Sequence, residues 1–540
     1  MDVQCIRLTN QSKIIQDYRD RKESILYQFQ YDPYQLKSFQ QRYNYLKTQT
    51  YKRDELVSLL IKQNNRWGHD ESVLQNIERL KDPNSVVVIG GQQAGLLTGP
   101  LYTIHKIVSI IIQAREQEQY LKAPVIPVFW IAGEDHDFEE INHVYTYEDH
   151  QLKKNRLNEM EIKKEPVSQK KLDKNLIERW FKNVFSTYQE TEWTNELYSS
   201  VNDALRKSET YVDFFARLIR QLFKNEGLVL IDSNDADLRR FEVEYFLQLI
   251  HHRDHLAKAV VNEFDEQLKR GYEIDLDVST NDAHLFYHLK GERLLLVKNN
   301  DVWTSKDGEV SFTKEQIVEK IKSEPENFSN NVVSRPIMQE FIFPVLSFIA
   351  GPGEVAYWSV LKGAFSAVNL QLPIVTPRMS ITLLKHDHKK RLEQLNLSLE
   401  SVISTGCRYN KLKWLKKQTR QPIDEMIDGI KGEFQKIHEP LQELAATIRD
   451  DVHALTKTNL KVIEQQLDFV GKRLNKAVEE KHSRTLSYYD EIDCFYYPKD
   501  GLQERIWNIY YFMNEYGLDL PQKLLEVPPN WEQDHIVVTI

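Results

Sequence analysis

Residues 90–106, GGQQAGLLTGPLYTIHK, follow the apolar run VVVI at residues 86–89, and this stretch decides the fold class. An apolar strand, a glycine-rich turn and a helix, in that order, build a ligand site at the carboxyl edge of a parallel sheet. Glycines let backbone N–H groups approach a ligand, and a helix N-terminus favours negative charge. The glycines of the turn do not have the G-x-G-x-x-G spacing. The turn is not a phosphate-binding loop either, because Leu96 and Leu97 follow Gly95 where Lys and Ser or Thr would be needed. It predicts a ligand site without naming a common nucleotide.

Short apolar runs alternate with helices after a charged, helical segment that covers the first 80 residues. Such alternation is typical of an α/β protein whose parallel sheet is covered on both faces. The expected strands are residues 86–89, 125–131, 228–231, 346–349 and 374–376, and the expected helices are residues 100–117, 211–224, 235–268 and 354–369.

The pattern predicts a core of residues 1–390 that carries two insertions. Residues 146–208 are polar and expected to be helical. Residues 275–335 predict a small antiparallel unit with turns at Asn300-Asp301 and Asp307-Gly308. The last segment, residues 486–540, has mixed α/β composition and is expected to pack on the core.

Residues 391–485 are expected to form an α-helical coiled-coil domain. Apolar residues there follow the spacing of a heptad from 427 to 448 and again from 460 to 474. The phase breaks at residues 456–458, which leaves either two antiparallel helices or one long helix. A long row of apolar residues at heptad spacing usually packs against another chain, so we expect these helices to form an intermolecular contact. The alternative is a helix pair that packs on its own domain.

Composition and charge exclude several classes of protein. The net charge of −9 over 540 residues argues against nucleic acid as the main partner. The first residues lack the apolar core of a signal peptide, and no apolar run reaches membrane-spanning length. Three scattered cysteines fit neither a disulfide framework nor a metal-binding spacing. A cytoplasmic protein with no membrane or nucleic-acid partner is expected.

Each predicted strand ends in polar residues. These ends are Gln92-Gln93, GEDHD at 133–137, DSND at 232–235, GPGE at 351–354 with Tyr357 beyond, and TPRMS at 376–380. Any one of them could simply turn the chain and cap the next helix. Because the fold brings all five to one edge, together they predict a binding site.

The densest cluster is GEDHDFEE, residues 133–140. His136 could act as a general base held by Asp135 or Asp137. The same residues could bind Mg²⁺, or Zn²⁺ together with His143. A third interpretation is that the aspartates cap a helix. His105 lies one turn into the helix after the glycine turn and could face either the site or the core.

Two further groups could hold an anion. GPGE opens a helix whose N–H groups suit phosphate or carboxylate, although Glu354 could serve only the helix dipole. Arg378 and Lys385 supply positive charge, with a solvated basic face as the alternative for the lysine. The histidines at 251, 252 and 255 have metal-like spacing but are expected to be structural.

Four long strings resemble the bacillithiol biosynthesis cysteine-adding enzyme family. They are the glycine-rich stretch above, FWIAGEDHDFEEINHV at 129–144, RPIMQEFIFPVLSFIAGPGEVAYW at 335–358 and TPRMS. The resemblance implies a Rossmann-like parallel-sheet core with two connecting-peptide insertions and a C-terminal coiled-coil domain that forms a homodimer. It also implies that cysteine is joined to glucosaminyl-malate by an amide bond.

The implied reaction assigns roles to the candidate residues. Forming an amide from a free carboxylate requires activation, so ATP or another nucleotide is expected, with Mg²⁺ as its companion and either an acyl-adenylate or an acyl-phosphate as intermediate. His136 or Asp137, with Asp135, would take the proton of the attacking amine. The residues expected to bind substrate or nucleotide are Gly91, Gln92, Gln93, Gly95, Thr98, His105, Gly351, Gly353, Glu354, Tyr357, Arg378 and Ser380, with Lys385 and Arg505 as candidates for a second nucleotide site.

Two other functions compete with this one. A nucleotide- or sugar-phosphate-dependent transferase could use the same sheet, because doubly wound folds host many chemistries. A non-catalytic dimeric scaffold would account for the coiled coil but not for five polar strand ends.

Overall fold

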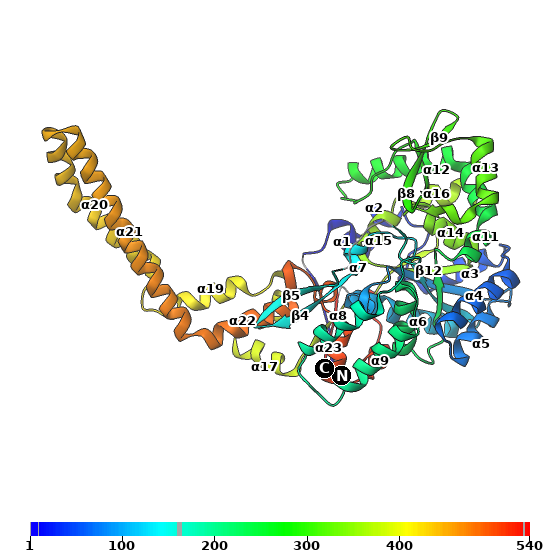
Figure 1. The fold of residues 1–540 in the computed structure, drawn as a ribbon, viewed down its shortest axis with the longest axis horizontal. Coiled ribbons are helices and arrows are strands. Elements are labelled where there is room, and N and C mark those ends of the chain that lie inside the picture. The colour runs from blue at the N-terminus through cyan, green and yellow to red at the C-terminus, as the bar shows by residue number, and fades with distance from the viewer. Residues whose placement is uncertain (1, 9, 159–164, 533–534) are drawn as a thin grey trace. The chain divides into compact units, whose positions relative to one another are not determined.

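The computed structural model describes residues 2–8, 10–158, 165–532 and 535–540. The chain forms two compact units. The first comprises residues 1–148, 152–384 and 503–540, and the second comprises residues 149–151 and 385–502. Figure 1 colours the chain from its N-terminus to its C-terminus.

The centre of the first unit is a five-stranded parallel sheet. Its order is β13–β12–β2–β3–β6, with strands Ile374–Pro377, Val345–Ala350, Val86–Gln92, Val125–Ile131 and Val229–Asp232. Almost every residue of these strands is buried. The predicted α/β fold with a parallel sheet is confirmed, because fully apolar runs are what a sheet covered on both faces requires.

Helices cover both faces of this sheet. Val87 and Ile89 of β2 belong to one apolar cluster with Leu56 and Leu60 of α4 (Arg53–Trp67). Because side chains alternate along a strand, the intervening residues face the other side, where α6 (Leu101–Leu121) packs on β2 and β3. The other helices of the core are α1 (Lys13–Arg19), α2 (Glu23–Leu26), α3 (Leu36–Leu46), α5 (Glu71–Arg79), α7 (Phe138–Ile141), α10 (Tyr211–Leu222), α11 (Ala236–Phe241), α12 (Val243–Lys269), α14 (Ser334–Ile342), α15 (Pro352–Trp358) and α16 (Lys362–Ala367).

The second insertion is the expected antiparallel unit. Its sheet has the order β10–β9–β8–β7–β11, with strands Ser311–Thr313, Val302–Ser305, Glu292–Asn299, Asp282–Leu289 and Phe328–Asn330. Asn300 and Gly308 take positive φ values of 56° and 79° at the two predicted turns. Helix α13 (Lys314–Ser323) follows β10.

The first insertion differs from the prediction, because it opens with a hairpin. Strands β4 (His143–Glu148) and β5 (Gln151–Arg156) pair with each other, and helices α8 (Lys174–Ser186) and α9 (Thr194–Arg206) follow. The predicted helical character therefore holds only for the second half. Its residues 159–164 lie outside the described residues. Strand β5 is mostly exposed and carries charged residues on both faces, so its sequence lacks the alternation of apolar and polar residues that would have predicted a strand.

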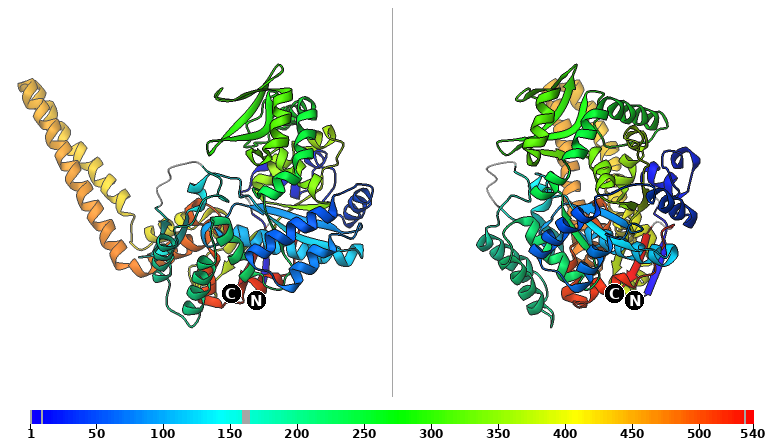
Figure 2. Two further views of the ribbon diagram at one scale, coloured as in Figure 1. Left: turned by 45° about the vertical axis from the view of Figure 1, so that its right-hand side comes forward. Right: turned by 90° about the vertical axis from the view of Figure 1, so that its right-hand side faces the viewer.

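A third sheet joins the two ends of the chain. Strand β15 (His535–Thr539) lies between β1 (Asp2–Ile6), to which it is antiparallel, and β14 (Ile381–Leu384), to which it is parallel. The two termini accordingly lie side by side in Figures 1 and 2. Helices α23 (Ile509–Tyr516) and α24 (Leu520–Leu525) precede β15 and belong to the same unit.

The second unit contains a helical hairpin. Helices α20 (Ile423–Ile448) and α21 (Asp450–Lys481) lie side by side in Figure 1 and in the left view of Figure 2. They run in opposite directions, because Asp424 contacts Asn475 at one end and His438 contacts Asn459 nearer the other. Of the two arrangements left open, the antiparallel pair is present, and the chain turns at Arg449. The remaining helices are α17 (His386–Gln394), α18 (Leu399–Thr405), α19 (Arg408–Lys416) and α22 (Ser483–Tyr496).

The coiled-coil domain is thus present as a heptad-patterned hairpin. Pro440 lies inside α20, where it removes one backbone hydrogen bond without ending the helix. None of the described helices combines the length and the apolar character needed to cross a membrane.

Candidate active site

The ends of β2, β3 and β12 meet at the carboxyl edge of the parallel sheet. Gly91 of β2 pairs with Trp130 of β3, and β12 pairs with β2 on the other side. A Cβ atom on Gly91 would lie 2.8 Å from the carbonyl oxygen of Trp130, so only glycine fits at this point. The register places the glycine-rich turn directly beside the start of GEDHD.

The glycine-rich turn is tightly folded. Leu97 and Thr98 take left-handed φ values of 48° and 69°, and Gly95 packs against Gly99. The Thr98 hydroxyl oxygen is buried and has no hydrogen-bond partner among the described residues. A left-handed pair of non-glycine residues stores strain of about 1–3 kcal/mol per residue, and such strain is often found at functional sites.

Lys106 connects the glycine-rich turn to GPGE. Its Nζ donates to the Gly91 carbonyl at 2.7 Å, to Gln92 Oε1 at 3.1 Å and to Glu354 Oε2 at 2.6 Å. The side chain is almost completely buried, and burial lowers the pKa of Lys106 although Glu354 opposes the shift. Lys106 therefore fixes the positions of two neighbouring strand ends.

GPGE forms the first turn of α15. The Glu354 carboxylate accepts from the backbone N–H of Gly351 at 2.6 Å, which makes it a helix cap as well as the partner of Lys106. A Cβ on Gly353 would meet no other atom within 4 Å, so this backbone borders open space. The Tyr357 hydroxyl accepts from Arg335 Nη2 at 2.5 Å.

The acidic residues that follow β3 have different partners. Glu134 is buried and paired with Arg239, which also binds Glu242 at 2.6 Å. Asp135 is partly exposed, and its carboxylate accepts from Gln93 Nε2 at 2.7 Å. The Arg293 guanidinium lies 4.0 Å from the same carboxylate. Glu134 is thus structural, whereas Asp135 faces the site together with Gln93.

His136 and Asp137 occupy different surroundings. The Nδ1 atom of His136 is buried and has no hydrogen-bond partner in the described part of the chain. The ring is near His288, whose pKa falls to about 3 through burial, Arg239, Arg293 and His136 itself. Asp137 is exposed, and its side chain caps no backbone N–H of α7. Of the two, His136 is the one with a buried nitrogen that has no partner among the described residues.

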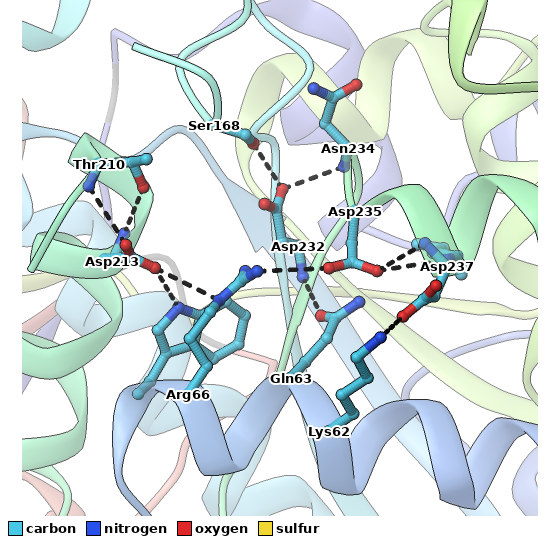
Figure 3. Close-up of polar contacts among 12 residues, drawn as sticks. Lys62, Gln63, Arg66, Ser168, Thr210, Asp213, Asp232, Asn234, Asp235 and Asp237 are labelled. Atoms are coloured by element: carbon cyan, nitrogen blue, oxygen red, sulfur yellow. Dashed lines mark hydrogen bonds and ion pairs between the residues drawn. The ribbon is translucent and has the colours of Figure 1, made fainter. Parts of the chain in front are cut away.

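The end of β6 has a structural role, shown in Figure 3. Asp232 Oδ1 accepts from Ser168 Oγ at 2.8 Å and from the Asn234 N–H at 3.0 Å. Burial raises the pKa of Asp232 to about 6, although these hydrogen bonds oppose the shift. Asp235 caps α11 by accepting from the N–H groups of residues 237 and 238. A Cβ on Gly133 would lie within 2.1 Å of Asp232 Oδ1, so glycine is required there.

A cavity of about 440 Å³ lies between the end of β3 and the second insertion. Arg293 and Arg335 line it, with Asn330, whose side-chain oxygen and nitrogen are both buried without a partner among the described residues. Arg293 also donates to the Asn330 carbonyl at 2.6 Å. Asp135 lines the same cavity, as do two aspartates of the insertion, Asp275 and Asp277. The cavity thus offers both cations and carboxylates.

Arg378 lies outside this cavity, in a buried cluster. Its two outer nitrogens each donate to Glu504 at 2.7 Å, and His105 Nδ1 and Ser380 Oγ contact the same carboxylate at 2.8 and 2.9 Å. Ser380 also contacts His535. The guanidinium fork is therefore already occupied, and His105 faces the core.

The two candidates for a second nucleotide site belong to different units. Lys385 lies in the second unit, with its Nζ 4.9 Å from the centre of the Phe495 ring. Arg505 lies in the first unit, is exposed, and is close enough to Tyr102 to lower the pKa of that phenol, which burial raises. Across the described residues no group of three or more histidine, cysteine or acidic side chains could hold a metal ion.

Sequence reasoning missed Lys106, Arg293, Asn330, Arg335 and Glu504. Lys106 was detectable, because it is the one charged residue among the apolar residues 104–112. Arg335 begins one of the strings that carry the family resemblance, whereas Arg293, Asn330 and Glu504 lie in an insertion and in the C-terminal segment, where no local pattern marks them.

The fold is that of a Rossmann-like α/β protein with a cavity lined by charged residues at the carboxyl edge of its parallel sheet. Residues 1–379 match the Rossmann-like N-terminal domain, and residues 381–540 the C-terminal coiled-coil domain, of the bacillithiol biosynthesis protein BshC. The chain belongs to the BshC family.

Similar proteins extend over the whole chain. A protein of Geobacillus sp. (strain WCH70) is 39% identical and covers 100% of both chains. One of Oceanobacillus iheyensis is 38% identical over 99% of this chain and 98% of its own. Both relatives are named cysteine ligase BshC.

Proposed function

We propose that this protein is a cysteine ligase that joins the carboxyl group of cysteine to the amine of glucosaminyl-malate, forming an amide in the synthesis of bacillithiol. The family and the names of the relatives support this proposal. The observation that carries it in the structure is the cavity that presents Arg293 and Arg335 together with Asp135. Both substrates carry an amine and at least one carboxylate, so a site that binds them needs both negative and positive side chains.

Arg293 and Arg335 would bind the malate carboxylates in this scheme. Arginine binds carboxylates through paired N–H donors, and a mostly buried guanidinium is little screened by water. The orphaned amide of Asn330 would complete the site by donating to the same group. This assignment replaces the anion-binding role expected for Arg378, whose fork is taken by Glu504.

His136 would take the proton of the attacking amine. Its unpartnered Nδ1 lies next to the acidic strand end, and histidine is the side chain that most often serves as a general base. The amide nitrogen keeps its bond to the sugar, the new C–N bond forms at the activated carbonyl, and the activating group leaves with the carboxyl oxygen. Asp135 would orient the substrate amine rather than move the proton.

ATP or another nucleotide would activate the carboxyl group, with Mg²⁺ bound mainly by the phosphates. The backbone that best fits a phosphate is the first turn of α15 at Gly353, where the structure leaves open space, with the neighbouring glycine-rich turn beside it. The cosubstrate would leave as AMP with pyrophosphate or as ADP with phosphate.

The test is mass spectrometry of the purified protein with cysteine, glucosaminyl-malate, ATP and Mg²⁺. The expected product has the mass of both substrates minus water, and the nucleotide product identifies the intermediate. Turnover of a nucleotide sugar without cysteine would favour a transferase instead. In Arg335→Met we expect kcat/KM to fall about 100-fold, with Arg335→Lys intermediate.

We also propose a cytoplasmic homodimer formed through the α20–α21 hairpin. Its apolar side chains include Leu441, Ile448, Leu455 and Phe469, which are 56–66% exposed. A row of large exposed apolar residues usually marks an interface. Light scattering should give a dimer for the wild type and a monomer for a variant that combines Leu441→Lys with Ile448→Lys. A monomeric wild type would refute the dimer.

A further inference from the structure

A second cavity, of about 590 Å³, lies at the other end of α6 from the glycine-rich turn. The helix connects two neighbouring parallel strands, so it runs against them and its last turns lie near the amino edge of the sheet. The cavity is bordered by α3, by the last turns of α6 (both labelled in Figure 1) and by residues 529–532 before β15. None of its described lining residues takes part in the proposed reaction.

Two buried amide oxygens line this cavity without a donor. Gln113 is 1% exposed, and its Nε2 donates to Thr376 Oγ1 at 3.1 Å, which leaves its Oε1 without a partner among the described residues. Gln117 is 4% exposed, and its Oε1 is likewise unsatisfied. Each buried acceptor without a donor costs about 1–3 kcal/mol. Residues four apart lie on the same face of a helix, so the two glutamines share the side of α6 that borders the cavity, although the Gln113 amide reaches Thr376 of the main sheet.

A carboxylate lies on the same face. Glu116 Oε accepts from the Trp531 indole N–H at 2.8 Å, and burial raises the pKa of Glu116 although this bond opposes the shift. Among the described lining residues there is another glutamate, Glu532, and no lysine, arginine or histidine. The electrostatic character of the cavity is therefore negative.

Aromatic rings complete the lining. Tyr34, Phe39, Tyr120 and Trp531 come from three separate segments of the chain. Aromatic faces attract cations, with about 0.5–2 kcal/mol for each well-placed ring. The cavity thus combines unsatisfied acceptors, a carboxylate and aromatic rings.

We propose that this cavity binds an organic cation, namely a primary amine or a guanidinium group carried on an apolar body. The N–H donors of such a group would satisfy the Gln117 oxygen, and its charge would pair with Glu116. The apolar body would pack on Phe39 and Trp531. The site is separate from the ligase chemistry and does not depend on it.

The test is calorimetric titration of the whole protein with phenethylamine and with 2-phenylethanol, which has the same ring and a hydroxyl in place of the ammonium. Phenethylamine should bind at least about 10-fold more tightly than the alcohol, a difference expected for a charge-paired ligand. Equal binding of the two molecules, or no binding of phenethylamine at millimolar concentration, would overturn the proposal.

Matched variants locate the site. Glu116→Gln keeps an acceptor for Trp531 but removes the charge, and it should weaken phenethylamine binding about 10-fold. Glu118→Gln, which removes the same charge from the same helix outside the cavity, should leave the affinity unchanged. Equal effects of both variants would show only general electrostatics and contradict the proposal. Trp531→Phe, which retains a ring, should weaken binding less than Trp531→Ala.

Discussion

Glu504 is expected to be one of the most important single residues for the stability of the first unit. It accepts two hydrogen bonds of 2.7 Å from Arg378 and is also contacted by His105 and Ser380. The side chains of Glu504 and Arg378 are only 2% and 5% exposed. Replacing Glu504 by leucine leaves the buried guanidinium without its partner, which costs about 3–5 kcal/mol.

The size of the change in melting temperature follows from the size of the unit. An unfolding entropy of about 2.1 cal/mol/K per residue over roughly 400 residues converts about 4 kcal/mol into a Tm lowering of roughly 4–5 °C. Differential scanning fluorimetry on the full chain measures this shift. Because the chain has two units, the Tm of the transition that responds to the substitution is the quantity to compare.

An exposed pair supplies the matched control. Arg7 and Asp20 are also 2.7 Å apart, but their side chains are 70% and 39% exposed. Asp20→Leu should lower Tm by about 1 °C or less, since such pairs contribute about 0–1 kcal/mol. Equal shifts for Glu504→Leu and Asp20→Leu would refute the argument from burial.

A double substitution separates the pair from its surroundings. Combining Glu504→Leu with Arg378→Met removes both charges, so the double variant should be more stable than the sum of the single effects by at least about 2 kcal/mol. Burial alone would raise the pKa of Glu504, but Arg378 and His105 outweigh it and hold that pKa well below its ordinary value. A group with a lowered pKa stabilises the fold at neutral pH and loses this effect only as pH falls through the lowered value. The Tm difference for Glu504→Leu should therefore be constant between pH 6 and pH 8.

Three other substitutions test the strand ends. Lys106→Met should lower stability by about 3 kcal/mol and the rate of the ligase reaction by at least about 10-fold, because the Glu354 carboxylate loses its partner; thermal unfolding and steady-state kinetics measure the two effects. Asp232→Asn should raise Tm at pH 8 more than at pH 4.5, because a raised native pKa of about 6 costs stability as pH rises through about 4 to 6, by about 3 kcal/mol in all. Gly91→Ala should destabilise the protein by about 1–3 kcal/mol in urea unfolding, because its Cβ would meet the Trp130 carbonyl at 2.8 Å.

Each of these tests has an outcome that contradicts it. For Lys106→Met, unchanged kinetics in a folded protein would show that the link between the two strand ends is only structural. For Asp232→Asn, an equal Tm gain at both pH values would show that ionisation of the carboxyl group is not the cause. For Gly91→Ala, wild-type stability would mean that the backbone relaxes at no cost.

The main sheet was predictable because its strands are short and largely apolar, and most of them end in glycine or acidic residues. The runs at 125–131 and 345–350 are buried along their whole length, as the pattern requires. The coiled-coil hairpin was predictable from its heptads, although the turn at Arg449 lies before the expected break at 456–458. The apolar spacing continues up to residue 448, so it does not mark the turn. The turn is made by the extended backbone of Arg449, between the two helices.

The rest of the site depends on contacts between distant segments. Arg293 and Arg335 line the cavity although they are far from Asp135 in the sequence. The charges around them in the sequence are like those around an arginine at the protein surface. Glu504 lies in a short polar segment that gives no sign of burial. Such residues become recognisable only when the tertiary fold places them beside a partner. Lys106 is the exception, because a lone charge in an apolar helix is costly and so signals a buried partner.

The pairing of β1 with β15 has a consequence for synthesis on the ribosome. Residues 2–6 emerge long before the strand that pairs with them, which is made roughly 530 residues later. At about 5–20 residues per second, the first strand waits roughly half a minute to two minutes for its neighbour. During that time the edge of β1 is open to other strands, as is that of β14 once residues 381–384 have been made. The nascent protein should therefore depend on chaperones until β15 is released, and ribosomes stalled before it should yield aggregating fragments.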